Sequence, residues 1–312
     1  MPKRVFWAYV IIVLAVCVSV AVALDPMGPA CSQLTAGQFS AGAEYSCSRM
    51  DVKLDNGKGS WQGFTNGSLE AFNSGRMSST TIENLNLSKV YANLSYGITG
   101  NWQAGLRLGA AKADFNYKDG ARPLFPVPVA GGGGVLFPDG QKADGDSGFS
   151  IGLDSKATFY EKGKLRVGGL FQISWSQSDG KKSGLHPVDG GVNAFMGPAE
   201  GIPWSHSVDI SITEIQLALG STYRLTERVS IYGGPFFHFI DGHVNGRYSE
   251  SGEAFGSTLD YRTKYRYDID ENSFFGGYVG VQFEAFRNAL FNIEYQHTAF
   301  ADALGMQLIW RF

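Results

Sequence analysis

Apolar and polar residues alternate with a period of two over much of the chain beyond residue 38. The pattern is clearest on either side of the turn at residues 99–101. Before the turn the apolar positions are Val90, Ala92, Leu94, Tyr96 and Ile98, and after it they are Trp102, Ala104, Leu106, Leu108 and Ala110. Successive side chains of a strand point to opposite faces, so the alternation predicts two strands, each with one apolar face, joined as a hairpin.

The same unit returns three more times, around short turns at 161–164, 225–228 and 286–288. Long polar, Gly-rich segments separate the units at 55–80, 117–147, 179–206 and 244–272. With a first strand near 39–52 and a terminal strand, the chain has about ten strands. Short turns at one rim and long loops at the other are typical of a transmembrane antiparallel up-and-down β-barrel, with short periplasmic turns and long extracellular loops.

Two irregularities leave eight or twelve strands open as alternatives. The apolar positions change parity between Cys47 and Met50 and again between Ile212 and Ile215. Pro235 lies within a strand pattern, where a closed barrel offers no edge strand to receive it, and the neighbouring glycines predict a β-bulge there.

Charged residues within the predicted strands share the face opposite the apolar one. A charge facing lipid costs about 2–4 kcal/mol at mid-membrane, so this face is expected to line the lumen. Acids and bases are mixed along it, and paired charges neutralise each other in a narrow bore. We therefore predict a lumen plugged by salt bridges, with a hydrated, weakly conducting bore as the alternative. The network comprises Glu44, Lys89, Arg107, Asp154, Lys156, Arg166, Glu214, Arg224, Glu284, Glu294 and Arg311.

The first 23 residues have the pattern of a secretory signal peptide. Lys3 and Arg4 precede an apolar stretch at 5–20, and Ala21-Val22-Ala23 matches a cleavage site. An uncleaved membrane anchor is the alternative, because about 20 apolar residues can span a bilayer. The expected division is a signal peptide at 1–23, a periplasmic N-terminal segment at 24–37 and an outer-membrane barrel at 38–312, exported through the general secretory pathway.

Composition narrows the class further. The 41 glycines and 13% aromatic residues suit strands with tight turns, and the net charge of -3 does not indicate a nucleic-acid partner. Beyond the signal peptide, Cys31 and Cys47 either pair in an oxidising periplasm or stay as two thiols. No Cys/His spacing predicts a metal site, and no cofactor is expected.

Three features resemble the bacterial outer-membrane β-barrel superfamily, especially its small OmpA-type and adhesin-like members. They are the signal peptide, the hairpin ANLSYGITGNWQAGLRLGAA and the terminal strand MQLIWRF. The resemblance implies the Gram-negative outer membrane, with lipid and lipopolysaccharide as surroundings. It also implies that the barrel-assembly machinery reads the terminal strand through Met306, Leu308, Trp310 and Phe312.

The leading functional hypothesis is a non-enzymatic surface protein, structural or adhesive, that contacts an extracellular partner through its loops. The loop ARPLFPVPVAGGGGVLFPDG carries apolar residues suited to such contact. A narrow channel for small solutes is one alternative.

A surface protease is the other alternative. Asp144-Gly-Asp146 and Asp241-Gly-His243 are similar to the paired Asp-x-Asp and Asp-x-His motifs of the omptin proteases, which are also ten-stranded barrels. The resemblance implies that His243 and an aspartate activate water as a general base. The first pair lies at the far end of its loop compared with that family, which weakens the match.

Overall fold

A computed structural model describes residues 24–77, 79–117, 142–143, 145–186, 202–254, 257–270, 275–286 and 288–312. These residues form one 14-stranded sheet. Its strands are β1 (Phe39–Thr65), β2 (Ser68–Arg76), β3 (Thr80–Thr99), β4 (Trp102–Tyr117), β5 (Lys142–Ala143), β6 (Gly145–Asp146), β7 (Gly148–Lys162), β8 (Leu165–His186), β9 (Ile202–Arg224), β10 (Val229–Ala254), β11 (Ser257–Asp270), β12 (Phe275–Phe286), β13 (Ala289–Thr298) and β14 (Ala301–Arg311). No helix among the described residues is long and apolar enough to cross a membrane.

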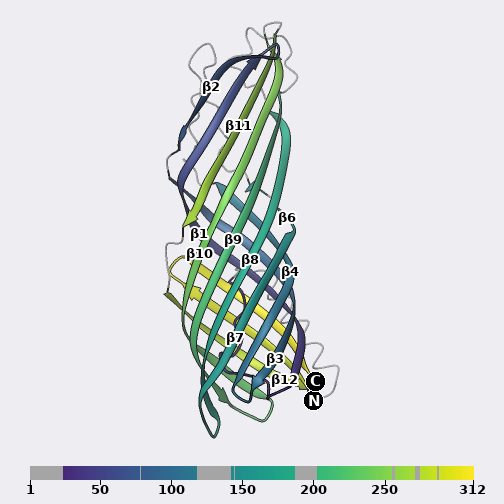
Figure 1. The fold of residues 1–312 in the computed structure, drawn as a ribbon, viewed down its shortest axis with the longest axis vertical. Helices are drawn as coiled ribbons and strands as arrows, with labels where there is room; N and C mark the ends of the chain where they lie inside the picture. Colours follow the sequence, from purple (N-terminus) through teal and green to yellow (C-terminus); the bar gives the residue numbers. More distant parts are fainter. Residues whose placement is uncertain are drawn as a thin grey trace.

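Antiparallel pairing closes the sheet into a barrel. The ring runs β3-β4-β7-β8-β9-β10-β12-β13-β14-β1 and returns from β1 to β3. The predicted all-β barrel of about ten strands is therefore confirmed. All four predicted short turns join neighbouring strands at one rim, which we call the short-turn rim, and the chain ends there at Phe312 (Figure 1).

The strands continue far beyond the positions predicted from the sequence. The segments predicted as loops at 55–80 and 244–272 are mostly paired strands, whereas residues 118–141 and 187–201 of the other two predicted loops lie outside the described residues. β8 and β9 remain paired up to His186 and Ile202, and β10 runs to Ala254. β11 pairs with both β10 and β1, and β2 pairs with the far half of β1. We call this tall part, opposite the short-turn rim, the extension (Figure 1).

The outer face of the lower barrel is apolar. Leu153, Leu219 and Val279, for example, are more than half exposed. Apart from Lys162 at the short-turn rim, the outward strand positions contain no Asp, Glu, Lys or Arg within 90–98, 102–110, 149–162, 165–177, 211–223, 229–239, 275–283 and 304–310. A continuous belt of this kind is the lipid-facing surface of a membrane barrel. It includes Val90, Leu94, Leu106, Leu108, Ile151, Leu153, Phe171, Leu217, Leu219, Ile231, Phe237, Val279 and Leu308.

The interior of the extension is apolar as well. Its core contains Met50, Val52, Leu54, Ile82, Leu85, Val208, Ile210, Ile212, Val244, Tyr267 and Ile269. Met50 therefore faces the same side as Glu44, and Ile212 the same side as Glu214. Both strands pass these points without a register shift on the β14 and β8 sides. The parity changes in the sequence thus mark a change of lumen lining from polar to apolar, above the level at which the outside meets lipid.

The bulge expected near Pro235 is also absent. β10 stays in register with β12 through Gly234, Pro235 and Phe236. On the β9 side, Gly233 pairs with Ser221 and Phe236 pairs with Ala218, so neither strand has an extra residue between these pairs. The glycines instead permit close backbone approach, because a Cβ at Gly234 would lie 2.0 Å from the carbonyl oxygen of Leu219.

A buried histidine in the extension predicts a pH dependence of stability. His206 Nε2 lies 2.7 Å from the Tyr265 hydroxyl oxygen, and burial lowers the pKa of His206 to about 4. The unfolded chain, with a histidine pKa of about 6.5, binds the extra proton more readily. Stability should therefore fall by about 3 kcal/mol as the pH drops from about 6.5 to 4. Urea unfolding in nonionic detergent measures this loss.

The matched variant is His206→Gln, which keeps a hydrogen-bonding side chain and does not titrate. Its stability should vary less over the same pH range. His243→Gln, at a half-buried site on the outer face, is the control and should behave like the wild type. An identical pH profile for His206→Gln and wild type would contradict the assignment.

Candidate functional site: the closed lumen

The N-terminal segment, which we define as residues 24–35, lies inside the barrel and not below it. Leu24, Met27 and Cys31 are completely enclosed. The prediction of a periplasmic segment at 24–37 is therefore corrected for this stretch. The physical reason is that the lumen supplies partners to its backbone: Glu294 accepts from the Met27 amide at 2.9 Å, and Thr158 from that of Ser32 at 3.1 Å.

Asp25 is the centre of a buried ion network. Its carboxylate lies 2.9 Å from Lys89 Nζ and 3.5 Å from Arg107 Nη1. Lys89 also contacts Glu214 Oε1 at 2.6 Å, and Arg107 contacts Glu44 Oε2 at 3.6 Å. The segment thereby joins charges from β1, β3, β4 and β9 across the bore. All five side chains are at most 5% exposed, so each charge depends on the others for compensation.

Aromatic and polar groups complete this layer. The Arg107 guanidinium lies over the Tyr91 ring, 5.2 Å from its centroid. His238 Nε2 is 3.7 Å from Glu214 Oε2. Gln296 donates to the Asp25 carbonyl oxygen at 2.9 Å. The result is a polar layer of hydrogen-bonded and ion-paired side chains that reaches across the bore.

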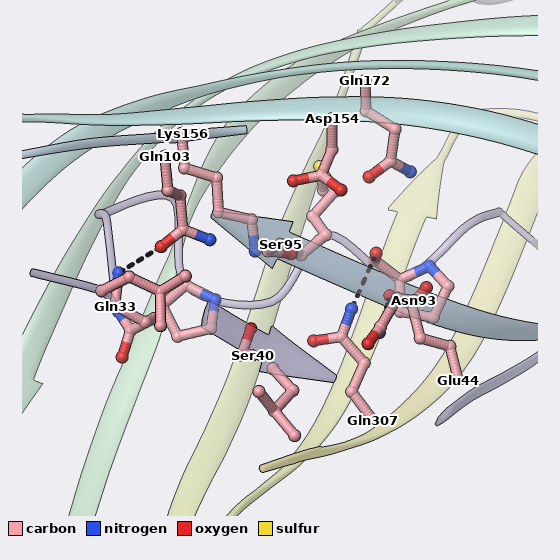
Figure 2. Close-up of a pocket in the computed structure, with 15 residues that line it drawn as sticks. Gln33, Ser40, Glu44, Asn93, Ser95, Gln103, Asp154, Lys156, Gln172 and Gln307 are labelled. Carbon is pink, nitrogen blue, oxygen red and sulfur yellow. Dashed lines mark hydrogen bonds between the residues drawn. The ribbon is translucent and has the colours of Figure 1, made fainter. Parts of the chain in front are cut away.

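A second set of contacts fixes the segment nearer the short-turn rim. Lys156 donates to the Met27 carbonyl at 2.5 Å, Arg166 to that of Ser32 at 2.6 Å, and the Gln33 amide to Gln103 at 2.6 Å. Figure 2 shows Gln103, Lys156 and Asp154 pointing from the wall toward the segment. The cavity among them has a volume of about 20 Å³, which is room for little more than one water molecule.

Glycines in the wall allow this close fit. A Cβ at Gly97 would lie 2.0 Å from the Thr35 carbonyl oxygen, and one at Gly168 would lie 2.9 Å from the Cys31 Cα. The backbones of Gly97 and Gln38 are hydrogen bonded at 2.9 Å. Any larger residue at position 97 would push the segment away from the wall, because the close atom belongs to backbone.

The eleven residues predicted as a lumen network divide into two groups. Seven line the enclosed lumen: Glu44, Lys89, Arg107, Asp154, Lys156, Glu214 and Glu294. The other four, Arg166, Arg224, Glu284 and Arg311, line the mouth at the short-turn rim. There, Arg311 Nη2 lies 3.4 Å from Glu284 Oε1, and Arg166 Nε lies 3.2 Å from Glu161 Oε2.

Asp25 was missed by sequence reasoning. It stands two residues after the expected cleavage site, in a stretch with neither strand nor helix periodicity. Charge balance gave no signal for it, because the two bases of the buried layer, Lys89 and Arg107, are already matched by Glu214 and Glu44. The third acid of the layer comes from the segment.

The structure does not bring the protease-like residues together. Asp144 lies outside the described residues. Asp146, on β6, faces outward opposite Asp179 of β8, whereas Asp241 and His243 face outward on β10. β8 and β9 lie between β6 and β10, so three strand spacings, about 14 Å, separate Asp146 laterally from Asp241 and His243. That distance is too long for them to share one water molecule.

The remaining predicted residues are the two cysteines and the apolar residues of the terminal strand. Cys31 and Cys47 are buried and are not joined by a disulfide. Leu308, Trp310 and Phe312 are exposed on the lipid-facing side of the chain's end, and Met306 is half-buried on the same side. No group of three or more His, Cys, Asp or Glu side chains in the described ranges is placed to hold a metal ion.

Comparison with known proteins gives only distant likenesses. No protein-family profile and no curated sequence matches the chain. The outer membrane protease OmpT of Escherichia coli has 11% identity and a TM-score of 0.37, with 88% of this chain and 97% of that chain covered. The translocator domain of the autotransporter NalP of Neisseria meningitidis has 10% identity and a TM-score of 0.38, with 90% of both covered.

A third structure is Ail, the attachment invasion locus protein of Yersinia pestis. It has 13% identity and a TM-score of 0.23, with 89% of this chain and 100% of that chain covered. These proteins are all outer-membrane barrels of differing roles. Likeness at this level says nothing about what the present chain does, so its function must be argued from its own geometry.

Proposed function

We propose that the chain is a non-enzymatic outer-membrane surface protein, structural or adhesive, whose barrel is closed to ions and solutes. The observation that carries this is the filled bore. The N-terminal segment and its ion network close the lower level, and the apolar core of the extension closes the upper level. A barrel closed at both levels is suited to anchoring the extension and its loops in the membrane, and not to transport.

The outer belt supports the membrane location. Its exposed apolar side chains form a band without Asp, Glu, Lys or Arg, and above it the outward positions become polar, with Lys53, Asp55, Asp179, Asp209 and Asp241. A water-soluble barrel would bury the apolar positions of its wall and expose the charged ones. In this protein the lower barrel exposes its apolar positions, whereas the extension buries its apolar positions and exposes charged ones.

Ion conductance tests the closed barrel. The refolded protein in planar bilayers should show no stable single-channel steps, because the cavity among Gln103, Asp154 and Lys156 has room for about one water molecule. A buried charge pair would have to separate before ions could pass. Large, stable steps in the wild-type protein would favour the narrow-channel alternative and overturn the proposal.

The adhesive role in this proposal rests on residues 118–141, between β4 and β5. The apolar residues among them, Leu124, Phe125, Val135, Leu136 and Phe137, lie outside the described residues. β4 and β7 pair directly from Trp102–Ala157 to Ala111–Gly148, so the barrel closes without the loop. Deleting residues 118–141 should preserve folding and reduce attachment of expressing cells to an apolar surface severalfold.

The control is deletion of residues 187–201 between β8 and β9, which removes 15 residues where the first deletion removes 24. Folding is measured by heat-dependent electrophoretic mobility and attachment by cell counts on polystyrene. Unchanged attachment after deletion of 118–141 would leave a structural role alone.

The surroundings of such a protein follow from the same proposal. Membrane lipid would contact the belt, and lipopolysaccharide the polar band above it. The barrel-assembly machinery would read Met306, Leu308, Trp310 and Phe312, all on one face of β14 and the chain end. An extracellular partner would bind through the loops.

A further inference from the structure

A hollow of about 210 Å³ opens at the short-turn rim, on the inner side of the wall. Basic side chains dominate its lining. Lys164, Arg166, Arg224, Arg228 and Arg311 face two acids, Glu227 and Glu284, which gives a formal excess of three positive charges. The enclosed lumen above contains five acids and three bases, a formal excess of two negative charges: Asp25, Glu44, Asp154, Glu214 and Glu294 against Lys89, Arg107 and Lys156. Among the described residues, none of these carboxylates forms an ion pair with a basic residue of the hollow.

The register of the strands explains why the basic groups converge. Arg166 lies opposite Thr222 on β9, and Arg224 lies opposite Ser230 on β10. Ser230 in turn lies opposite Gln282 on β12. Thr222 and Arg224 are successive inward positions of β9, so Arg166 and Arg224 lie in neighbouring rows, and the β9–β10 turn adds Arg228 to the same hollow.

Several donors at the hollow have no internal partner. Within the described part of the chain, the side chains of Lys164, Arg224 and Arg228 form no ion pair. Arg311 Nε and Gln282 Nε2 are buried donors without a hydrogen-bond partner, and Gln282 is only 8% exposed. Buried donors and clustered like charges are both costly unless an anion satisfies them.

We infer that this hollow binds a phosphate-class oxyanion. Arginine guanidinium groups donate paired hydrogen bonds that match the oxygens of phosphate, and several such groups surround one volume here. Arg166 is already held by Ser32 and Glu161, so the free donors are those of Arg224 and Arg228, together with Nε of Arg311. The anion is either free phosphate or the phosphate of a phospholipid headgroup at the adjacent membrane surface.

Calorimetric titration of the full-length protein in nonionic detergent tests the inference. Inorganic phosphate is one probe, and phosphatidylglycerol in the same micelles is the other, with diacylglycerol as its phosphate-free counterpart. Binding of inorganic phosphate identifies a site for the free ion. Binding of phosphatidylglycerol alone identifies the headgroup as the source.

Whichever probe binds the wild type, the variant Arg224→Gln/Arg228→Gln should bind it at least ~10-fold more weakly, because two charge-assisted contacts are lost. Both positions are exposed at the rim, so the fold should be retained. The matched control, Lys181→Gln/Lys264→Gln, removes equal charge from the extension and should bind like the wild type. Absence of binding by both probes, or equal loss in both double variants, would overturn the inference.

Discussion

Deleting residues 24–35 while keeping the signal peptide should open the lower lumen to water and reagents from the short-turn rim. Gln172 reports on this opening, because its side chain is enclosed and donates to the Asp25 carbonyl at 3.4 Å. A cysteine at this position, in a Cys47→Ser background, should react with a polar maleimide at least ~10-fold faster after the deletion. Each tenfold increase in rate corresponds to about 1.4 kcal/mol less free energy needed to open a path to the cysteine.

Ion conduction should stay low in the same deletion variant, because the apolar core of the extension still closes the upper level. The control probe is Ser230→Cys at the rim hollow, which should react at similar rates with and without residues 24–35. Protection of the cysteine at position 172 in both proteins would show that the segment does not seal the lumen.

Replacing Lys89 with methionine should destabilise the barrel by about 3–5 kcal/mol, the usual result of removing one partner from a buried ion pair. Asp25 and Glu214 would lose the ammonium group that lies within 2.9 Å of both, in a layer closed to water. Urea unfolding of the protein in lipid vesicles, followed by tryptophan fluorescence, measures the change.

Lys53→Met is the matched control on the same sheet. Lys53 pairs with Asp55 on the exposed outer face, where water solvates each charge when the pair is broken. Its unfolding midpoint should remain within experimental error of the wild type. The double variant Lys89→Met/Glu214→Met should recover much of the loss, because both charges are then gone. Equal midpoints for Lys89→Met and Lys53→Met would contradict the assignment of the network.

The barrel could be predicted from the sequence because lipid imposes a strict rule on its outer face. Charge at Leu106 or Leu219 would be costly, so the alternation is clean and the inward residues follow by parity. The strands of the extension were not predicted, because there the outward residues face water and are polar, whereas the inward residues are apolar. Polar and glycine-rich residues at 55–65 or 179–186 therefore looked like loops, although they pair as regular strands.

The N-terminal segment shows a different limit. Its position is set by individual contacts, such as Asp25 with Lys89 or Met27 with Glu294, which join residues far apart in the chain. Periodicity carries no information on such contacts. The sequence predicted charged groups in the bore, yet the acid that connects them lay in a stretch without pattern.

The enclosed segment also constrains how the molecule is made. Met27 is hydrogen bonded to Glu294 across 267 positions of the chain, and β1 is paired with β14 on the same side of the barrel. Contacts between such distant parts form late, because loop closure must precede them. The contact of Met27 with Glu294 can therefore form only once β13 has joined the wall. The closure of the lumen by residues 24–35 is then completed together with the last strands and not ahead of them.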